Sequence, residues 1–195
     1  MKSLISRLAY ILTILFVTSS AAADQYDATI KTFKESREGK QFFQSAYGYA
    51  VFPTIGKGGY GIGVAHGKGR VYVDGKVTGK SSVTKVTVGA QVGGQAYSQI
   101  IFLEDKRAYE EFTSGNFEFG AQLSAVAITT GAQAQVSTTG SSASANPGAG
   151  DAGAQQAKYY KGAAVLVYTK GGFMYEASLG GQKYSFKPIR KAESI

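Results

Sequence analysis

Few side chains of this chain could perform covalent chemistry. Among its 195 residues there is one histidine, His66, and no cysteine. A serine nucleophile needs a base beside it, and only His66 could serve as one. The same histidine has no companions at the spacing of metal ligands. The residue types therefore predict a protein that is not an enzyme, with no cofactor and no metal site.

Two glycine-rich stretches approach nucleotide-binding motifs but miss their spacing. In Gly75 to Ser81 (GKVTGKS) the glycines stand one residue too close for a phosphate-binding loop. A β-pattern also follows Ser81, where that loop requires a helix. Gly61-Ile62-Gly63 lacks the third glycine of a dinucleotide fingerprint, because His66 occupies that place. Neither stretch predicts a nucleotide site.

Basic side chains are the more promising ligand-binding groups. The formal net charge is +8, and the excess lies early in the chain, with a smaller group near the C-terminus. For an exported chain, a basic balance favours lipid headgroups or envelope polymers over nucleic acid. The early group is Lys31, Lys34, Arg37, Lys40, Lys57, Lys68, Arg70, Lys76, Lys80 and Lys85, and the late group is Lys183, Lys187, Arg190 and Lys191.

Glycine, aromatic and basic residues are densest between Tyr47 and Gly75. Tyr47 to Pro53 is predicted as a short strand that ends at Pro53, because proline offers no donor to a sheet. Gly56 to Gly59 is predicted as a tight connection. Tyr60 to Ala65 then forms a second strand of about 20 Å with one face bare of side chains. Another strand, a packed aromatic ring or a bound chain could approach that face.

Asp74-Gly75 between alternating residues is the strongest hairpin signal in the sequence. A two-residue turn there places Tyr72 opposite Val77, an aromatic to β-branched pair of the stabilising kind.

Several ordered motifs carry a family resemblance that extends roughly from Ser45 to Phe186. The chain resembles the SYLF-domain family, which is named for lipid-binding members and is also known as an actin-binding domain after fungal members. The motifs are Ala50-Val51-Phe52-Pro53, Lys57 to Gly63 (KGGYGIG), Gly67-Lys68-Gly69-Arg70, Gly89 to Gln95 (GAQVGGQ), Ile100 to Leu103, Phe117 to Gly120, Lys170 to Phe173 and Leu179-Gly180-Gly181.

The resemblance implies binding to anionic phospholipid or to a membrane surface. On that expectation Lys57, Lys68 and Arg70 meet lipid phosphates, each contributing about 1 kcal/mol near an anionic surface. Phe52 and Tyr60 are expected at headgroup depth as amphipathic anchors. Lys85 completes the candidate lipid-binding set, and a protein partner stays possible.

Residues 1–23 are predicted as a signal peptide outside the fold. Lys2 and Arg7 precede an apolar run of about ten residues, shorter than the roughly 20 of a membrane-spanning helix. Ala21-Ala22-Ala23 supplies a small-residue cleavage site. We expect an exported protein, periplasmic or secreted, that can lie peripherally on the envelope membrane.

Residues 24–44 are predicted as an amphipathic N-terminal segment, with a helix from Asp24 to Gly39. Tyr26, Ile30 and Phe33 recur at helical spacing, and Gly39 is expected to end the helix. Basic residues on the polar face could favour a membrane interface. The apolar stripe is narrow, however, so packing on the protein core is the preferred interpretation.

The rest of residues 45–195 is predicted as one domain made mostly of strands. Gln99 to Leu103 and Gly162 to Thr169 are apolar on both faces, as central strands are. Glu104 to Thr113 is expected to be a short helix capped by Asp105. Residues 138–157 are low in complexity and are predicted as a flexible loop. The final hairpin is expected to turn at Gly180-Gly181.

Two more patterns are informative in this part of the chain. Thr84, Val86 and Val88 alternate with Lys85 and Thr87, which is typical of a half-buried strand. Glu118 lies between phenylalanines and is expected to point outward from a strand.

Together these features predict a single α+β domain. Antiparallel strands surround a central apolar sheet, with an N-terminal helix and one short internal helix. The expected function is non-enzymatic lipid binding at the cell envelope. Two alternatives stay open: an envelope structural or interaction module that binds protein, such as actin, or peptidoglycan, and a small outer-membrane β-barrel.

Overall fold

A computed structural model describes residues 25–115, 117–119, 126–127 and 158–189. Three long antiparallel strands dominate it and lie in the order β1–β2–β5. Two short strands lie on β5, β3 antiparallel and β4 parallel. The strands are β1 (Gly48–Val73), β2 (Lys76–Leu103), β3 (Phe117–Phe119), β4 (Val126–Ala127) and β5 (Ala163–Pro188).

Three helical segments accompany the sheet in the described part of the chain. The first covers residues 25–35, and it is followed by α2 (Arg37–Ser45) and α3 (Lys106–Thr113). The predicted fold class, a mixed α+β domain with an antiparallel sheet, is confirmed. None of the helices in the described ranges is long and apolar enough to cross a membrane.

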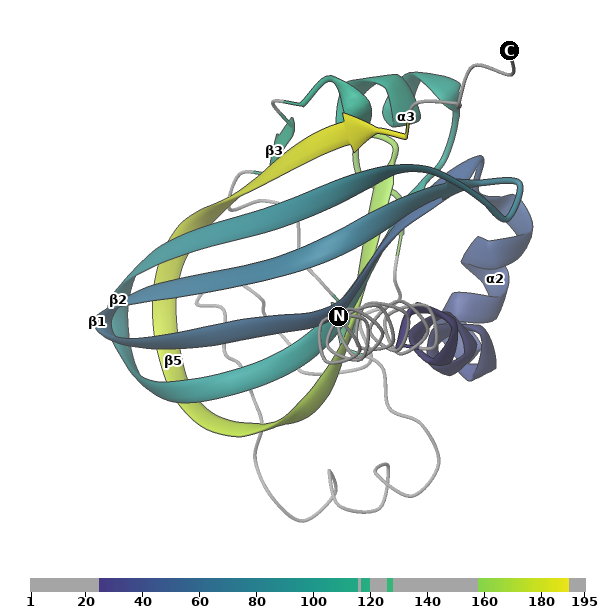
Figure 1. Cartoon of the computed structure of the whole chain (residues 1–195). Coiled ribbons are helices and arrows are strands. Elements are labelled where there is room, and N and C mark those ends of the chain that lie inside the picture. The colour runs from purple at the N-terminus through teal and green to yellow at the C-terminus, as the bar shows by residue number, and fades with distance from the viewer. Residues whose placement is uncertain (1–24, 116, 120–125, 128–157, 190–195) are drawn as a thin grey trace, which may run out of the picture.

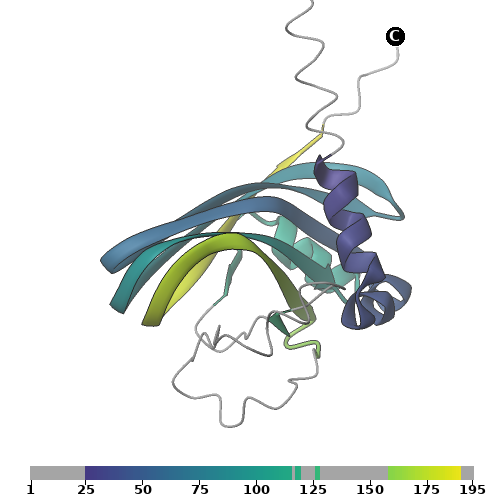
Figure 2. The same ribbon diagram turned by 90° about the horizontal axis from the view of Figure 1, so that it is seen from below.

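The three long strands bend together, so the sheet folds over on itself (Figures 1 and 2). We call the part paired by residues 48–57 of β1, 95–103 of β2 and 163–172 of β5 the first leaf. Residues 62–73, 76–88 and 179–188 of the same strands form the second leaf. The bends gather at one end of the molecule, and the helices lie toward the other (Figure 1).

A backbone irregularity accompanies the bend. Tyr60 pairs with Val92 and Ile62 pairs with Val88, so Gly61 alone faces three residues of β2. Gly61 has a φ of 68°, a conformation that side-chain-bearing residues rarely adopt. Extra residues of this kind bend a strand and increase its twist. The predicted glycine-rich site of close approach is thus the place where the sheet folds over.

Several predicted strand ends are wrong because the long strands continue through them. β1 passes through Pro53 with only a register shift between Phe52 and Ile55, and it also includes Gly56 to Gly59. β5 runs through Gly180 and Gly181, which pair with Thr87 and Val86 instead of forming a turn. Proline and glycine therefore mark bulges and a bend rather than strand ends. A bulge accommodates the missing donor of Pro53.

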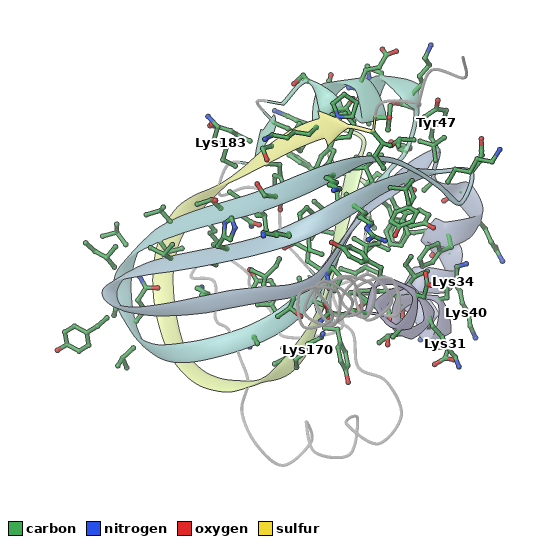
Figure 3. The ribbon with its side chains drawn as sticks, in the orientation of Figure 1. Lys31, Lys34, Lys40, Tyr47, Lys170 and Lys183 are labelled. Carbon is green, nitrogen blue, oxygen red and sulfur yellow. The ribbon has the colours of Figure 1, made fainter. Side chains whose placement is uncertain are left out.

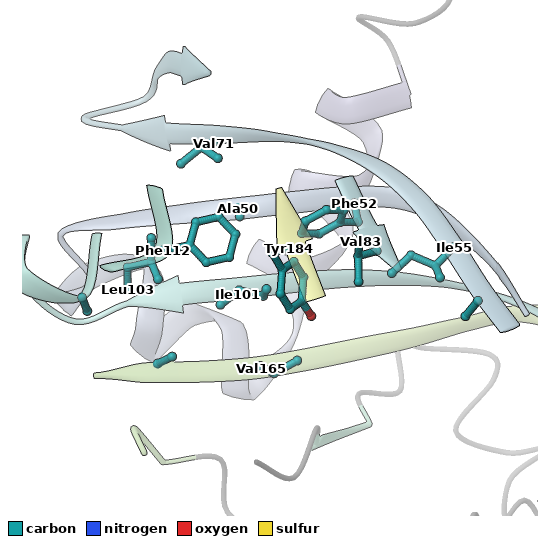
Figure 4. Close-up of a cluster of buried hydrophobic side chains, with 13 residues drawn as sticks. Ala50, Phe52, Ile55, Val71, Val83, Ile101, Leu103, Phe112, Val165 and Tyr184 are labelled. Carbon is teal, nitrogen blue, oxygen red and sulfur yellow. The ribbon is translucent and has the colours of Figure 1, made fainter. Parts of the chain in front are cut away.

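The main apolar core lies between the two leaves (Figure 4). Phe52 of the first leaf packs against Tyr184 of the second, with ring centroids 5.6 Å apart. A side chain at Gly69 would meet the Phe52 ring at 2.6 Å, so only glycine leaves room for it. Gln99 of the first leaf donates a 2.7 Å hydrogen bond to the Tyr184 hydroxyl, which in turn donates to Gln182. The leaves are joined by these contacts.

A second core lies between the first leaf and the N-terminal helices. Ile30 and Phe33 of the first helix are buried there, which confirms that this stripe packs on the protein core. Phe42 of α2 stacks on Phe102 of β2 at 5.2 Å.

The predicted single helix is wrong beyond residue 35. The Ser36 hydroxyl donates to the Phe33 carbonyl and accepts from the Gly39 amide, so it closes one helix and caps the next. Gly39 lies inside α2, where a side chain would collide with the Phe33 carbonyl.

Two local predictions are confirmed. Asp74 and Gly75 both have positive φ, as a two-residue hairpin turn requires, and Tyr72 pairs with Val77. Asp105 caps α3 by accepting from the Ala108 amide, and Phe112 is buried. The predicted signal peptide and the predicted loop at 138–157 lie outside the described residues.

Candidate functional site

One side of the second leaf faces away from the core, and we call it the outer face. The side chains that alternate with the buried positions of β1 and β2 lie there, together with their partners on β5. Its members run from the bend toward the hairpin turn. They are Ile62, Val64, His66, Lys68 and Arg70 of β1, Lys80, Ser82, Thr84, Val86 and Val88 of β2, and Lys183, Ser185 and Lys187 of β5.

Three cations lie side by side near the hairpin end of the outer face. Arg70 pairs with Lys80, and Lys80 pairs with Lys187 on its other side, so they form a row across β1, β2 and β5. Lys80 and Lys187 are exposed. Like charges directly opposite each other on neighbouring strands are destabilising. This basic row therefore costs folding free energy unless an anion lies over it.

Two further lysines extend the positive charge toward the bend. Lys68 pairs with Ser82, whose hydroxyl is 2.7 Å from that of Ser185. Lys183 lies one strand further across and contacts Glu118 of β3 at 3.2 Å. Figure 3 labels Lys183 away from the helix lysines Lys31, Lys34 and Lys40. Glu118 is the single acidic residue among the described β-strand residues on this face, and it is exposed as predicted.

Arg70 is more restrained than the lysines. Its guanidinium lies over the Tyr26 ring, 4.2 Å from the centroid, and forms a hydrogen bond with Tyr72. Burial raises the pKa of Tyr26 above its ordinary 10.0, and the Arg70 charge partly offsets that rise. Burial likewise raises the pKa of Tyr72, against the hydrogen bond from Arg70. Arg70 thus joins the outer face to the first helix as well as contributing charge.

The bend carries a cluster of exposed apolar side chains. Tyr60 pairs with Val92, Ile62 with Val88 and Val64 with Val86, so six residues form three cross-strand pairs. We call this set the apolar tip. Tyr60 is 86% exposed, Ile62 62% and Val88 63%, and the other three are about half exposed. Contiguous exposed apolar surface of this kind marks an interaction site.

Buried polar groups hold the tip from beneath. The Thr87 hydroxyl donates to the Gln91 side-chain oxygen at 2.8 Å, and the Gln91 amide donates to the Gly61 carbonyl at 3.2 Å. Both side chains are almost fully buried. They approach Gly63 so closely that an added Cβ would lie 2.3 Å from the Gln91 oxygen. The tip is therefore built on a fixed scaffold.

The half-buried alternation predicted for this part of β2 is confirmed, and the buried side is the one that carries Thr87 rather than the valines. Thr87 points inward and is buried, whereas Val86 and Val88 are exposed. Lys85 is half-buried and lies on the inner side of the leaf, opposite buried Ala65. Polar residues thus occupy the inner positions near the bend because Thr87 and Gln91 satisfy each other there.

The predicted lipid-binding residues divide into two groups. Lys68, Arg70 and Tyr60 lie on the outer face or at its tip. Phe52 is fully buried in the core, and Lys57 is only 8% exposed and lies in β1 rather than in a turn. Phe52 and Lys57, with inward-facing Lys85, are therefore not displayed on this face.

Lys80, Lys183 and Lys187 were not predicted as site residues, and neither was any residue of the apolar tip except Tyr60. The charge distribution contained the three lysines, but their grouping depends on how three distant strands pair. The alternating Val86 and Val88 were a sequence signal for the tip. The alternation did not show, however, which side of the strand is exposed.

Catalytic geometry is not found on this face. His66 is exposed, and its Nδ1 lies 3.2 Å from the Thr84 hydroxyl. Within the described ranges, His, Asp and Glu side chains do not come together in groups able to hold a metal ion. The arrangement presents charge and apolar surface, which is the chemistry of a binding face.

Comparison with known protein families identifies the family to which the chain belongs. The Ysc84 family, described as "Las17-binding protein actin regulator", matches residues 84–188. This match covers more than half of the chain, so the protein belongs to the Ysc84/SYLF domain family. Domains of this family are generally non-catalytic binding domains. Neither a curated protein nor a solved structure matches the chain.

Proposed function

We propose that the protein binds anionic membrane surfaces through the outer face of its second leaf. The carrying observation is the basic row, in which Arg70, Lys80 and Lys187 lie opposite one another on three strands. Repulsion within that row is relieved when phosphate groups lie over it. The hydroxyls of Ser82 and Ser185, one pair away, add hydrogen-bonding groups for the same phosphates.

The proposal replaces part of the predicted site. Lys68 and Arg70 are kept, Lys80, Lys183 and Lys187 are added, and buried Phe52 and Lys57 are left out. Each basic residue near an anionic surface contributes about 1 kcal/mol. Several such residues on one face give useful affinity for a membrane without any single deep pocket.

The test reverses charge where folding does not depend on it. Lys80→Glu with Lys187→Glu should weaken binding to phosphatidylglycerol-containing vesicles by at least about 30-fold, since about 2 kcal/mol of attraction is lost. Arg70 is left intact because it packs on Tyr26. Replacing two cations of a repulsive row should leave the free energy of unfolding unchanged or slightly higher. Vesicle co-sedimentation and urea unfolding measure the two effects.

A matched control separates the site from net charge. Lys40→Glu with Lys158→Glu makes the same change in charge at exposed lysines outside the outer face. This control should bind almost as well as the unmodified protein. Raising salt should weaken binding of both, because the Debye length falls from about 8 Å at physiological ionic strength to about 3 Å at 1 M. Equal losses in both double variants would reject the outer face as the site.

A protein surface is the second candidate ligand, because the family description names an actin regulator. Co-sedimentation with actin filaments in the absence of lipid distinguishes this function. If filaments retain the protein and anionic vesicles do not, the membrane proposal is wrong.

Export completes the proposal. The predicted leader over residues 1–23 supports cleavage after Ala23. N-terminal sequencing of the protein recovered from its native host should then begin at Asp24. A membrane-embedded species that retains Met1 would contradict it.

A further inference from the structure

We infer that the apolar tip enters the lipid bilayer while the basic face of the same leaf lies over the headgroups. The inference rests on the proposed membrane function and adds to it a point of insertion. The tip is formed by Tyr60, Ile62 and Val64 of β1 with Val86, Val88 and Val92 of β2.

Leaving the apolar tip in water is unfavourable. Six apolar side chains in three neighbouring pairs are all about half exposed or more. Strand residues at a fold-over would ordinarily turn their apolar side to the core. Here the inner positions are taken by hydrogen-bonded Thr87 and Gln91, so the valines and Ile62 are held outward.

The apolar tip and the cations lie on one continuous face whose order of charge matches that of an anionic bilayer. From the bend toward the hairpin turn, the outer side of β2 carries Val88 and Val86, then Thr84 and Ser82, and then Lys80. Apolar side chains are therefore followed by hydroxyls and then by a cation. An anionic bilayer has the matching order, with an acyl interior beneath a charged surface. A soluble anion would engage the cations but leave the tip exposed.

The spacing along the strands fits this order. Lys183 pairs with Thr84, four residues from Val88, which corresponds to about 13 Å at 3.3 Å per residue. Lys68 lies six residues from Ile62, or about 20 Å. Interfacial segments enter the bilayer by about 5–10 Å. A tilted leaf that inserts its tip to that depth brings Lys183 to the phosphates first and Lys68 after it.

Tyr60 also has the chemistry of an interfacial residue. Tyrosine is enriched at membrane–water interfaces, where its ring lies among the headgroups and its hydroxyl stays hydrated. The Tyr60 side chain is the most exposed large apolar group among the described residues. A fluorescent residue at position 60 is therefore well placed to report insertion into the bilayer.

The experiment uses the absence of tryptophan from the chain. Full-length Tyr60→Trp carries a single tryptophan at the tip. The control, Tyr47→Trp, carries one at a tyrosine that is 39% exposed in the helix-bearing part of the molecule, where Figure 3 labels it. With vesicles of phosphatidylglycerol and phosphatidylcholine, the emission of Tyr60→Trp should shift to the blue, and brominated acyl chains should quench it. The emission of Tyr47→Trp should do neither.

A second pair of variants tests the contribution to affinity. Ile62→Thr with Val88→Thr keeps β-branched side chains but removes apolar surface, and should weaken vesicle binding by about tenfold or more. Ile189→Thr makes the same kind of change at a side chain that is 48% exposed near the C-terminal end of β5. That control should bind like the unmodified protein.

The outcomes separate the two proposals. If vesicles bind the protein in a salt-sensitive way but the tip tryptophan of Tyr60→Trp neither shifts nor is quenched, insertion is wrong and surface binding stands. If the unmodified protein does not bind anionic vesicles at all, both are wrong. A blue-shifted emission of Tyr60→Trp without vesicles, with a concentration-dependent doubling of mass, would show that a second copy covers the tip and would overturn insertion.

Discussion

Two tyrosine–valine pairs on the same two strands have opposite environments. Tyr72 pairs with Val77 beside the hairpin turn, and Tyr60 pairs with Val92 at the bend. Tyr72 is 5% exposed, whereas Tyr60 is 86% exposed. Tyr72 stacks on Tyr49 with ring centroids 5.1 Å apart and belongs to the core under the N-terminal helices.

The difference shows that residue pairing on a sheet does not by itself decide what a side chain does. The covered pair stabilises the fold because a third element lies over it. The uncovered pair gains little from folding, so its apolar surface stays available for a ligand. Under the proposed function, the same sequence chemistry serves stability beside the hairpin turn and binding at the bend.

Removing each tyrosine side chain should change stability by very different amounts. Tyr72→Ala should lower the free energy of unfolding by about 3 kcal/mol, because it leaves a cavity beneath the helices. Tyr60→Ala should change it by less than about 0.5 kcal/mol, since the side chain is exposed. Urea unfolding of the two variants measures both. Similar losses in the two variants would mean that the tip is covered in solution.

A smaller effect extends the comparison to a tyrosine between the leaves. Tyr184→Phe removes the hydroxyl that accepts from Gln99 and donates to Gln182. Because Gln99 is buried, its unsatisfied amide should cost about 1–3 kcal/mol. Tyr60→Phe removes an equivalent hydroxyl from an exposed ring and serves as the control, with no measurable loss. An unchanged urea midpoint for Tyr184→Phe would show that the contact does not join the leaves.

The smallest effect concerns alkaline pH. Burial raises the pKa of Tyr184 well above its ordinary 10.0, with the Gln99 hydrogen bond opposing and Tyr97 adding to the rise. A group whose pKa is raised by folding contributes its full stability below the unfolded pKa and loses it as pH rises toward the folded pKa.

The free energy of unfolding should therefore fall above about pH 10. The contribution of Tyr184 to this fall should approach about 1.4 kcal/mol per pH unit, which is the free energy that corresponds to one pKa unit. The Tyr184→Phe variant should lose that part of the slope, and Tyr60→Phe should keep it. Parallel alkaline curves for the unmodified protein and Tyr184→Phe would contradict the assignment.

Much of the local structure was predictable because nearby residues decide it. Asp74-Gly75 fixes its own hairpin, since both residues tolerate positive φ. Asp105 followed by an amphipathic run predicts α3. The apolar runs at Gln99 to Leu103 and Gly162 to Thr169 predict interior strands, and they lie in β2 and β5.

The basic row could not be predicted, because it depends on a bulge. Counting back from the turn alone would place Arg70 opposite Gly79. Tyr72 pairs with Val77 but Val71 pairs with Gly79, so Thr78 is an extra residue and Arg70 faces Lys80. One inserted residue thus brings two cations together on one face.

Sequence alone determined the Asp74-Gly75 turn, the Asp105 cap, the interior strands and the family resemblance, because these depend on neighbouring residues or on ordered motifs. Only the tertiary structure decided that Phe52 is core, that Lys57 is buried and that Val86, Val88 and Val92 are exposed. The physical reason is the fold-over of the sheet. The alternation of a strand shows which residues share a side, but the leaf that packs against the strand decides which side is buried.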